Sequence, residues 1–315
     1  MAKILTLTLN PALDITIGLD LLRAGAVNRA QTQQSHAAGK GLNVAQVLAD
    51  LGHSVTVAGF LGQDNLRPFE ELIAWRGFAD CFVRVPGETR SNIKLVEADG
   101  RVTDINGQGP EVDEAARSAL MRRLLQVAPG HAAVVVAGSL PRGISPEWFC
   151  QLLDQLKDLG LKVALDSSGQ ALRAGLGSTP WLVKPNTEEL GEVLGVDVHG
   201  LAEQRSAAQQ LLARGVEHVV VSDGAQGVSW FAAGIALHAQ PPKVRVASTV
   251  GAGDSLVAGM VHGLLQAEPA MQTLRRATAI AAQAVSQVGF GIRDSEQLAH
   301  LEAGVRLTEQ QEGCR

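Results

Sequence analysis

Cysteine is scarce in this chain. Its 315 residues include only three, Cys81, Cys150 and Cys314, with no CxxC pair and no histidine at the spacing of a metal site. A sparse, odd-numbered set of cysteines argues against a disulfide framework and favours a reducing compartment, so we expect a cytoplasmic protein.

An excess of basic charge is also missing. Lysine and arginine number 27 against 32 aspartates and glutamates, which gives a net charge of −5. A chain this acidic lacks the electrostatic surface that attracts nucleic acid or an anionic membrane, and we expect neither as a partner. Long apolar runs are missing too, since no stretch approaches the roughly 20 residues of a membrane span. The N-terminal "MAKILTLTLNP" is too short for a signal peptide and predicts a first strand.

Short apolar runs, by contrast, recur along the chain. They are β-branched and apolar on both faces, as in strands of a parallel sheet covered on both sides. The predicted strands span residues 4–9, 55–62, 133–139, 162–166, 181–184 and 218–222. Helical patterns cover residues 42–49, 112–127, 146–159, 187–194, 202–214 and 270–287. This alternation predicts one α/β domain over residues 1–315, with a doubly wound, mostly parallel sheet flanked by helices.

Two segments interrupt the alternation. Residues 13–35 carry strand signals without a helix, and residues 88–107 contain a hairpin pattern whose turn is Asp99-Gly100. We expect these insertions to form a small β-sheet that projects from the main domain. A sheet with one exposed apolar face needs a partner, so it would serve as a lid or as a dimer contact.

The stretch "STVGAGDSLVAG" at residues 248–259 stands at the start of a helical pattern. Residues 251–253 would place bare backbone amides at the helix N-terminus, where a phosphate can approach and where the helix dipole favours negative charge. Leu256 breaks the dinucleotide fingerprint, and "AAGKGLN" at residues 37–43 lacks the pattern of a Walker A loop. Neither stretch alone identifies a cofactor.

Asp254 follows these small residues, and two interpretations are open. As a general base, its carboxylate would accept the proton of an attacking hydroxyl while the loop amides stabilise a phosphoryl group in transfer. As a structural residue, Asp254 would be the N-cap of the helix that follows.

The stretch "KPNTEE" follows the predicted strand at 181–184, at the sheet edge where ligands bind in α/β proteins. Asn186 and Glu189 could approach a hydrated magnesium ion, which needs few protein oxygens. The alternative is a capping box, with Asn186 as N-cap and Glu189 three residues later. The stretch "VSDGAQG" follows another strand and adds Ser222, Gly224 and Gly227.

Six motifs occur in a fixed order along the chain: "AAGKGLNVA", "AGSLPRG", "DSSGQAL", "LVKPNTEEL", "VVVSDGAQG" and "STVGAGDSLVAG". They resemble the phosphofructokinase B family of ribokinase-like sugar kinases, and the resemblance covers essentially the whole chain. "HAAGKGLNVAQVLADLG" and "INGQGPEV" are most similar to the bacterial branch that phosphorylates fructose 1-phosphate at O6. The resemblance implies a ribokinase-like fold, a homodimer formed through the β lid, ATP as the phosphoryl donor, and Mg²⁺.

The resemblance also implies roles for individual residues. Asp254 resembles the catalytic base, and the matching anion hole consists of Gly251, Ala252 and Gly253. The element that organises Mg²⁺, through water, matches Asn186 and Glu189. The nucleotide contacts match Lys184, Asn186, Ser222, Gly224, Gly227 and Thr249. The sugar-phosphate site matches Asp14, Gly39, Lys40, Asn43, Arg90 and Ser139.

Other activities remain open at this stage. A kinase of fructose 6-phosphate or tagatose 6-phosphate fits the same motifs, and an inactive sugar-phosphate sensor would keep the fold without turnover. A sensor would be expected to lose Asp254, Lys184 or Glu189, and all three are present. A nucleoside or vitamin kinase has no substrate phosphate for Lys40 and Arg90 to bind.

Two positions depart from the pattern of the family. Ser248 stands where many relatives have an aspartate tied to a potassium site, which puts monovalent-cation activation in doubt. Asp223 replaces a common apolar residue and adds a negative charge near the predicted adenine region, and the sequence offers no explanation for it. Arg29 and Lys94 either assist Arg90 in phosphate binding or are solvated.

Overall fold

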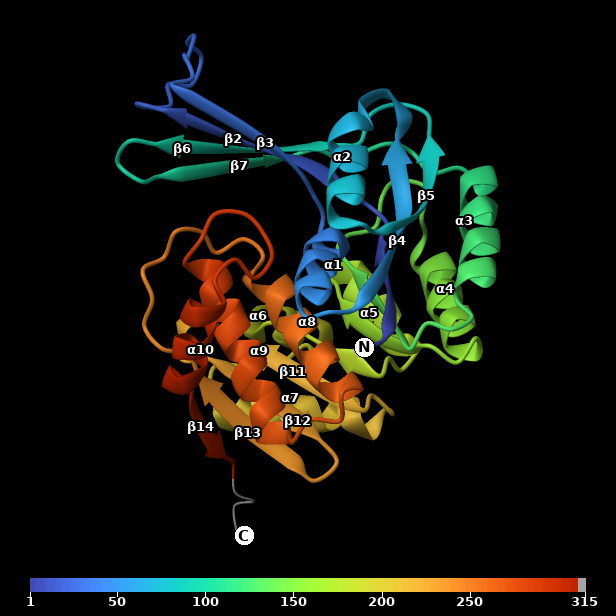
Figure 1. Ribbon diagram of the computed structural model, residues 1–315, viewed down its shortest axis with the longest axis vertical. Helices are drawn as coiled ribbons and strands as arrows, with labels where there is room; N and C mark the ends of the chain where they lie inside the picture. Colours follow the sequence, from blue (N-terminus) through green and yellow to red (C-terminus); the bar gives the residue numbers. More distant parts are fainter. Residues whose placement is uncertain (311–315) are drawn as a thin grey trace.

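The computed structural model describes residues 1–310, and its centre is a ten-stranded sheet between two layers of helices (Figure 1). The strands are β1 Lys3–Thr8, β4 Ser54–Gly62, β5 Ala79–Val85, β8 Ala133–Ala137, β9 Lys162–Asp166, β10 Leu182–Val183, β11 His218–Ser222, β12 Val228–Ala232, β13 Ile235–Gln240 and β14 Arg306–Glu309. Their order is β14-β13-β12-β11-β10-β9-β8-β1-β4-β5. The strands from β11 to β5 are parallel, and β12 to β14 form an antiparallel edge.

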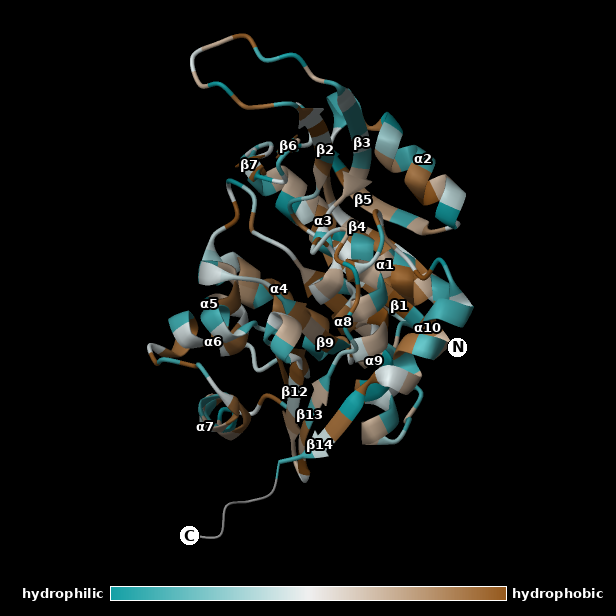
Figure 2. Cartoon of the chain, turned by 90° about the vertical axis from the view of Figure 1, so that its left-hand side faces the viewer, coloured by the Kyte–Doolittle hydropathy of each residue, from teal (hydrophilic) through white to brown (hydrophobic). Residues whose placement is uncertain are grey.

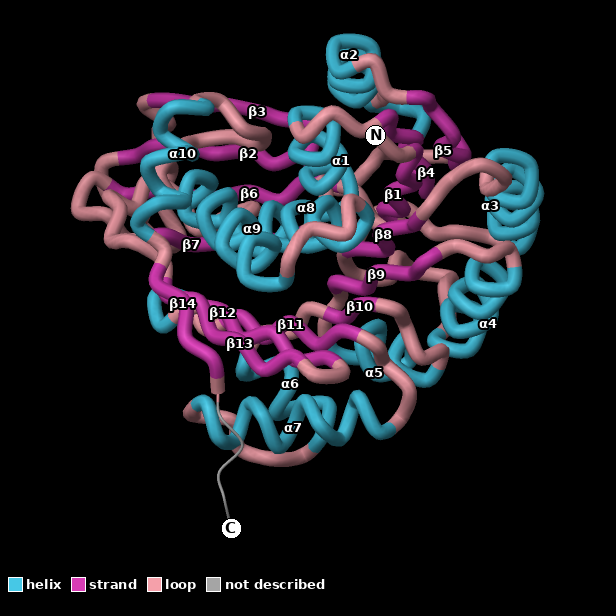
Figure 3. The backbone as a smooth tube through the Cα atoms, turned by 60° about the horizontal axis from the view of Figure 1, so that its bottom comes forward, coloured by secondary structure: helices cyan, strands magenta, loops and turns pink. Residues whose placement is uncertain are grey.

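Alternating side chains along the strands build one apolar core on each face of this sheet. In β1, Leu5 and Leu7 belong to one core and Ile4 to the other. The first core is covered by α3 Glu114–Val127, α4 Pro146–Asp158, α5 Gly169–Gly177, α6 Thr187–Leu194 and α7 Leu201–Ala213. The second is covered by α1 Lys40–Asp50, α2 Arg67–Arg76, α8 Ala252–Leu265, α9 Ala270–Val285 and α10 Ser295–Gly304 (Figure 3). The predicted doubly wound α/β fold is confirmed.

Helices α8 and α9 pack unusually closely. A Cβ atom on Gly259 would lie 2.6 Å from the Cα of Ala277, and one on Gly263 would lie 2.6 Å from the side chain of Thr273. The two glycines therefore let the helix backbones approach each other. This contact fixes α8, whose N-terminus carries the "GAGD" segment.

A second, four-stranded sheet projects from the body (Figure 1). Its strands are β2 Ala12–Leu19, β3 Thr32–Ala38, β6 Ser91–Glu97 and β7 Val102–Asn106, in the order β3-β2-β6-β7. The central pair is parallel and the outer pairs are antiparallel. These strands come from the two segments expected to be insertions. The connection between β2 and β3 extends away from the body (Figure 2).

The two faces of this small sheet differ in polarity. The register places Ile15, Ile93 and Ile105 in one row across three strands, so that one face is apolar. The neighbouring row contains Asp14 and Asn92, which belong to the opposite, polar face. Ile105 is half exposed, so the described residues leave the apolar face partly uncovered.

Several elements escaped the sequence analysis, namely β5, β12, β13, β14, α2, α5 and α10. Two of them, α10 and β14, bury few apolar side chains and leave a weak pattern, whereas β12 is buried throughout and was missed despite its apolar residues. Leu301 is the one buried residue of α10, and β14 is largely exposed. Such elements are stabilised mainly by the neighbours that they meet in the folded chain.

Candidate active site

The sheet places a site at its topological switch point. From β1 the chain continues on one side to β4 and β5, and later on the other side to β8 and β9, so the connections diverge at the carboxyl ends of β1 and β8. Ligands of open α/β sheets bind at such a point. Here Asn10, which follows β1, donates from Nδ2 to Ser139 Oγ after β8, at 3.2 Å.

Helix α8 begins beside this point, and its geometry decides between the two interpretations of Asp254. The N-cap is Gly251, whose φ of 83° is left-handed, and Asp254 is the third residue of the helix. The N-cap interpretation of Asp254 is therefore wrong. Its carboxylate instead accepts a hydrogen bond from Asn43 Nδ2 at 2.7 Å. The first amides of α8 have no partner within the helix, as at every helix N-terminus.

Asp254 and three other charged side chains form one cluster. Asp166, at the end of β9, is completely buried. Its Oδ1 lies 3.2 Å from Lys40 Nζ and 3.4 Å from Lys184 Nζ, while its Oδ2 has no hydrogen-bond partner among the described residues. Asp254 is only 5% exposed. Two carboxylates and two ammonium groups thus share one largely buried cluster.

The charges of this cluster set its protonation. Burial, together with the nearby charge of Asp166, raises the pKa of Asp254 to about 6. Lys40 opposes this shift. Burial alone would also raise the pKa of Asp166, but Lys184 and Lys40 hold it below its usual value. Burial alone would lower the pKa of Lys40, which Asp166, Asp254 and Glu189 instead raise. Of the two carboxylates in the cluster, Asp254 is therefore the one whose pKa lies closer to neutral pH.

The glycine-rich segment lies against Lys184. A Cβ atom on Gly253 would be 3.4 Å from Lys184 Nζ, so the ammonium group lies beside the N-terminus of α8. Lys184 is 5% exposed. A cation and free helix amides at one place form a binding site for an anion.

Asn186 and Glu189 form the capping box of α6. Asn186 Oδ1 accepts from the Glu189 amide at 2.7 Å, and Glu189 Oε2 accepts from the Asn186 amide at 2.9 Å. Asn186 also forms a backbone bridge with Ser222, so the ends of β10 and β11 meet. The structural alternative for this pair is confirmed, and its relation to a metal stays a prediction.

The remaining predicted nucleotide residues follow β11. Gly224 opens the 3₁₀ turn η2 Gly224–Gln226. Gly227 has a φ of 118°, and a Cβ there would lie 2.2 Å from the carbonyl oxygen of Ala239, so glycine is required for packing. Thr249 is exposed on the segment that leads into α8.

The "GKG" stretch starts α1 close to β1. Gly39 has a φ of 141°, and its Cβ would lie 2.8 Å from Thr8 Cγ2, while a Cβ on Gly41 would lie 2.4 Å from Thr8 Oγ1. These glycines therefore let α1 contact β1. Lys40, the first residue of α1, extends to Asp166 and belongs to the charged cluster around Asp254.

Asp14 and Arg90 come together on the polar face of the small sheet through Asn92. Asn92 Nδ2 donates to Asp14 Oδ1 at 3.0 Å, and Arg90 Nη1 donates to Asn92 Oδ1 at 3.2 Å. Arg90 also donates to the carbonyl oxygens of Asn10, Pro11 and Gly107. Most of its N–H groups are thus used to join the small sheet to the end of β1, which leaves few of them for the predicted contact with a substrate phosphate.

Three residues of the site were missed by the sequence analysis: Asn10, Asn92 and Asp166. Asp166 had a usable signal, because it ends an apolar strand and stands in the quoted motif "DSSGQAL". Asn10 and Asn92 gain their meaning only from long-range contacts. Lys94 pairs with Asp104 at 2.8 Å.

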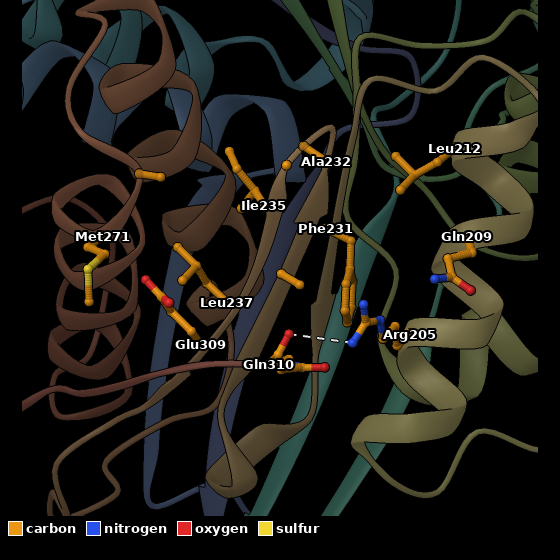
Figure 4. Close-up of a pocket in the computed structure, with 13 residues that line it drawn as sticks. Arg205, Gln209, Leu212, Phe231, Ala232, Ile235, Leu237, Met271, Glu309 and Gln310 are labelled. Carbon is orange, nitrogen blue, oxygen red and sulfur yellow. Dashed lines mark hydrogen bonds between the residues drawn. The ribbon is translucent and has the colours of Figure 1, made fainter. Parts of the chain in front are cut away.

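A cavity of about 540 Å³ lies away from all these residues (Figure 4). It surrounds the turn between β12 and β13, at the opposite edge of the sheet, and Arg205 and Phe231 line it. The described residues contain no group of three histidine, cysteine or acidic side chains placed to hold a metal ion directly. Across residues 1–310, no helix has the length and apolar character needed to cross a membrane.

Comparison with known proteins agrees with this geometry. Residues 7–297 match the pfkB family of carbohydrate kinases. The chain belongs to this family and is accordingly a phosphotransferase. A protein of Vibrio cholerae named 1-phosphofructokinase is 47% identical over 97% of this chain and 96% of its own length. The 1-phosphofructokinase of Escherichia coli K12 is 46% identical, over 97% of this chain and 98% of its own.

Solved structures support the same assignment. Phosphofructokinase-2 of Escherichia coli, described in complex with potassium, has a TM-score of 0.89 and 30% identity over 96% of this chain and 99% of its own. A possible 1-phosphofructokinase of Thermotoga maritima has a TM-score of 0.87 and 25% identity, over 98% of this chain and 100% of its own. The predicted family is confirmed.

Proposed function

We propose that this kinase transfers the γ-phosphoryl group of ATP to O6 of fructose 1-phosphate and forms fructose 1,6-bisphosphate and ADP. The observation that carries the chemistry is Asp254, buried at the N-terminus of α8 beside Lys40 and Lys184. The relatives named 1-phosphofructokinase support the choice of sugar phosphate.

In this reaction Asp254 accepts the proton of the attacking hydroxyl. A pKa of about 6 leaves the carboxylate ionised at neutral pH, and a general base works best with a pKa close to the working pH. The hydrogen bond from Asn43 engages Oδ2, so we expect Oδ1 to accept the proton of the hydroxyl.

The γ-phosphoryl group gains negative charge at its oxygens during transfer. The amides of Ala252, Gly253 and Asp254 and the ammonium group of Lys184 lie at one place to stabilise that charge. Lys40 forms an ion pair with Asp166 and belongs to the same charged cluster. The nucleotide would extend from there along Asn186, Ser222 and the turn η2.

Magnesium fits this site through water rather than through a full set of protein ligands. Asp166 Oδ2 is a buried oxygen with no hydrogen-bond partner among the described residues. Glu189 provides a second carboxylate nearby, whose charge raises the pKa of Lys40. Mg²⁺ prefers oxygen and commonly keeps several waters. When bound with ATP, the ion neutralises phosphate charge. Asp166 and Glu189 would hold its water shell.

The sugar would bind below the small sheet. Asp14 presents a carboxylate to the ring hydroxyls, and burial raises its pKa while Asn92 and Arg90 oppose the shift. The phosphate that the substrate already carries would accept a hydrogen bond from the remaining N–H of Arg90. Ser139 and Gly39 would lie next to this phosphate. Fructofuranose has a CH₂O arm at each end, so these residues alone would accept either monophosphate.

The apolar face of the small sheet, Ile15, Ile93 and Ile105 with their neighbours, would form the contact of a homodimer. That face is turned away from Asp14 and is partly uncovered. A solved structure of Escherichia coli phosphofructokinase-2 is described as tetrameric, so related chains do associate. An Ile93→Asp variant should sediment as a monomer if this face is the contact, and unchanged sedimentation would refute it.

One assay tests the proposed function. ADP release is followed with fructose 1-phosphate, fructose 6-phosphate and tagatose 6-phosphate at equal concentrations. We expect kcat/KM for fructose 1-phosphate to exceed that for fructose 6-phosphate at least about tenfold, or about 1.4 kcal/mol of transition-state binding. Equal or reversed preference would refute fructose 1-phosphate as the substrate and leave the kinase activity itself intact.

A further inference from the structure

Asp223, the unexplained departure from the family pattern, has a partner in the structure. Gln204 of α7, which is 1% exposed, donates from Nε2 to Asp223 Oδ2 at 3.3 Å. A carboxylate only accepts hydrogen bonds, so this contact fixes which end of the Gln204 amide faces the aspartate. The amide oxygen of Gln204 must then face away from Asp223.

That oxygen faces Ser229 of β12, which is completely buried. The distance from Ser229 Oγ to Gln204 Oε1 is 2.6 Å. An amide oxygen cannot donate, so the single hydroxyl proton of Ser229 lies in this bond. Ser229 Oγ then has only lone pairs for its other partners.

One of these partners is His238 of β13. Its Nδ1 is 3.1 Å from Ser229 Oγ, and its Nε2 is 3.1 Å from the carbonyl oxygen of Gln226. Because both partners accept, both ring nitrogens must donate. A neutral imidazole has one N–H and can satisfy only one of the two contacts.

We propose that a directional hydrogen-bond relay from Asp223 to His238 positions the turn η2 beside the nucleotide site, and that the relay is complete only when both ring nitrogens of His238 are protonated. The inference rests on the proposed use of ATP. Gln226 is the last residue of η2, and Asp223 directly precedes the turn, so the relay holds both ends.

The surroundings of His238 are consistent with a group that gains and loses a proton. Burial lowers the pKa of His238, and the bond to Gln226 and the charge of Asp223 oppose that shift. The register places Thr308 of β14 opposite His238 and Arg306 two residues further on the same face. On α7, Arg205 Nη1 donates to the carbonyl oxygen of Gln310, whose side-chain amide donates to Ser229 Oγ. Helix α9 packs against the other face of the sheet.

The proton therefore has a defined effect. Below the pKa of His238 the relay is complete, and above it the bond between His238 and Ser229 is lost. If the turn contacts the nucleotide, ATP binds the protonated form more tightly, and the KM for ATP rises as the pH passes upward through that pKa. By reciprocity, bound ATP raises the pKa of His238.

The first test is an NMR titration of His238 in the free protein, with its signal assigned by its absence in His238→Gln. Ser229→Ala decides the direction of the bond. If Nδ1–H donates to Ser229, the variant lowers the pKa of His238, by about one pH unit for one hydrogen bond. If the serine hydroxyl donates to a neutral ring instead, the variant raises the pKa, and the relay is refuted.

The second test measures the KM for ATP between about pH 5 and 8. The ratio of the His238→Gln value to the wild-type value removes contributions that both proteins share, such as titration of the nucleotide. We expect this ratio to be about 2- to 10-fold at low pH and near one at high pH, with kcat at saturating ATP and the KM for sugar phosphate little changed. His199→Gln, at an exposed histidine, is the matched control and should follow the wild type.

The two tests separate the possible failures. A ratio that is flat with pH, or an equal change in the KM for sugar phosphate, overturns the link between the relay and the nucleotide site. The NMR titration needs no nucleotide, so it decides the proton arrangement even if the protein proved unable to use ATP. That last result would refute the proposed function instead.

Discussion

Replacing Asp254 with asparagine should greatly lower kcat and at the same time stabilise the fold. The pKa of about 6 lies roughly two pH units above that of an ordinary aspartate, and each unit corresponds to about 1.4 kcal/mol. Keeping this buried carboxylate ionised at pH 7 therefore costs roughly 3 kcal/mol of folding free energy. Asparagine carries no charge and keeps an oxygen for the bond from Asn43.

The size of this stability gain depends on pH in a way that a packing change would not reproduce. A carboxyl group whose folded pKa is raised carries no penalty below its unfolded pKa of about 3.9. The penalty develops as the pH rises toward 6 and is constant above it. The stability gain of Asp254→Asn should therefore grow from near zero at about pH 4 to roughly 3 kcal/mol at pH 7.

Two measurements on the same purified variant check this reasoning. Urea unfolding at several pH values gives the difference in the free energy of unfolding, and ADP release gives kcat. We expect kcat to fall about 10²- to 10⁴-fold, the usual contribution of a general base. Asp197→Asn, which removes an exposed carboxylate, is the control and should change neither quantity with pH.

Either of two results would refute the argument. A wild-type kcat would show that Asp254 is not the base. A stability gain that is the same at pH 4 and pH 7 would show that the charge of Asp254 does not destabilise the folded state.

Three further predictions concern other parts of the molecule. The wild-type kcat should fall about tenfold per pH unit below about pH 6, because Asp254 must be ionised to accept a proton. Glu189→Gln should raise the Mg²⁺ concentration for half-maximal activity; an unchanged Mg²⁺ titration with a lowered Tm would leave the capping box as its sole role. Gly259→Ala should lower the free energy of unfolding by about 1–3 kcal/mol, because its Cβ would lie 2.6 Å from Ala277 Cα. Gly177→Ala, whose Cβ would lie 3.8 Å from Cys150 Sγ, should not share that loss in urea unfolding.

The sequence determined the architecture of the central domain. Every buried parallel strand that was predicted, from residues 4–9 to 218–222, is present within a few residues. These strands are apolar on both faces because helices cover both faces of the sheet. Such a strand is a short continuous apolar run, which can be recognised from the sequence alone. The antiparallel strands β12 to β14 were missed, although β12 and β13 pair with strands adjacent to them in the chain; only β14 joins the sheet from a distant segment.

The sequence also marked several residues that the fold brings to one edge of the sheet, because carboxyl ends of parallel strands share that edge. Lys184, Ser222 and the "GAGD" segment were each marked by their place after a strand or before a helix. The order of six motifs then indicated the family, which the comparisons confirm. The pattern could not decide between a capping role and a functional role, because both need the same residues at the same spacing.

Tertiary structure alone decided how these residues act. It placed Asp254 at the third position of α8, which excludes the N-cap alternative, and it brought Asn43 to its carboxylate from 211 positions away in the chain. It placed Asp166 between two lysines, and it gave Asp223 a partner on α7. Burial and charge pairing arise from contacts between distant segments, so the pKa of a site residue and the direction of its hydrogen bonds are properties of the folded chain rather than of the local sequence.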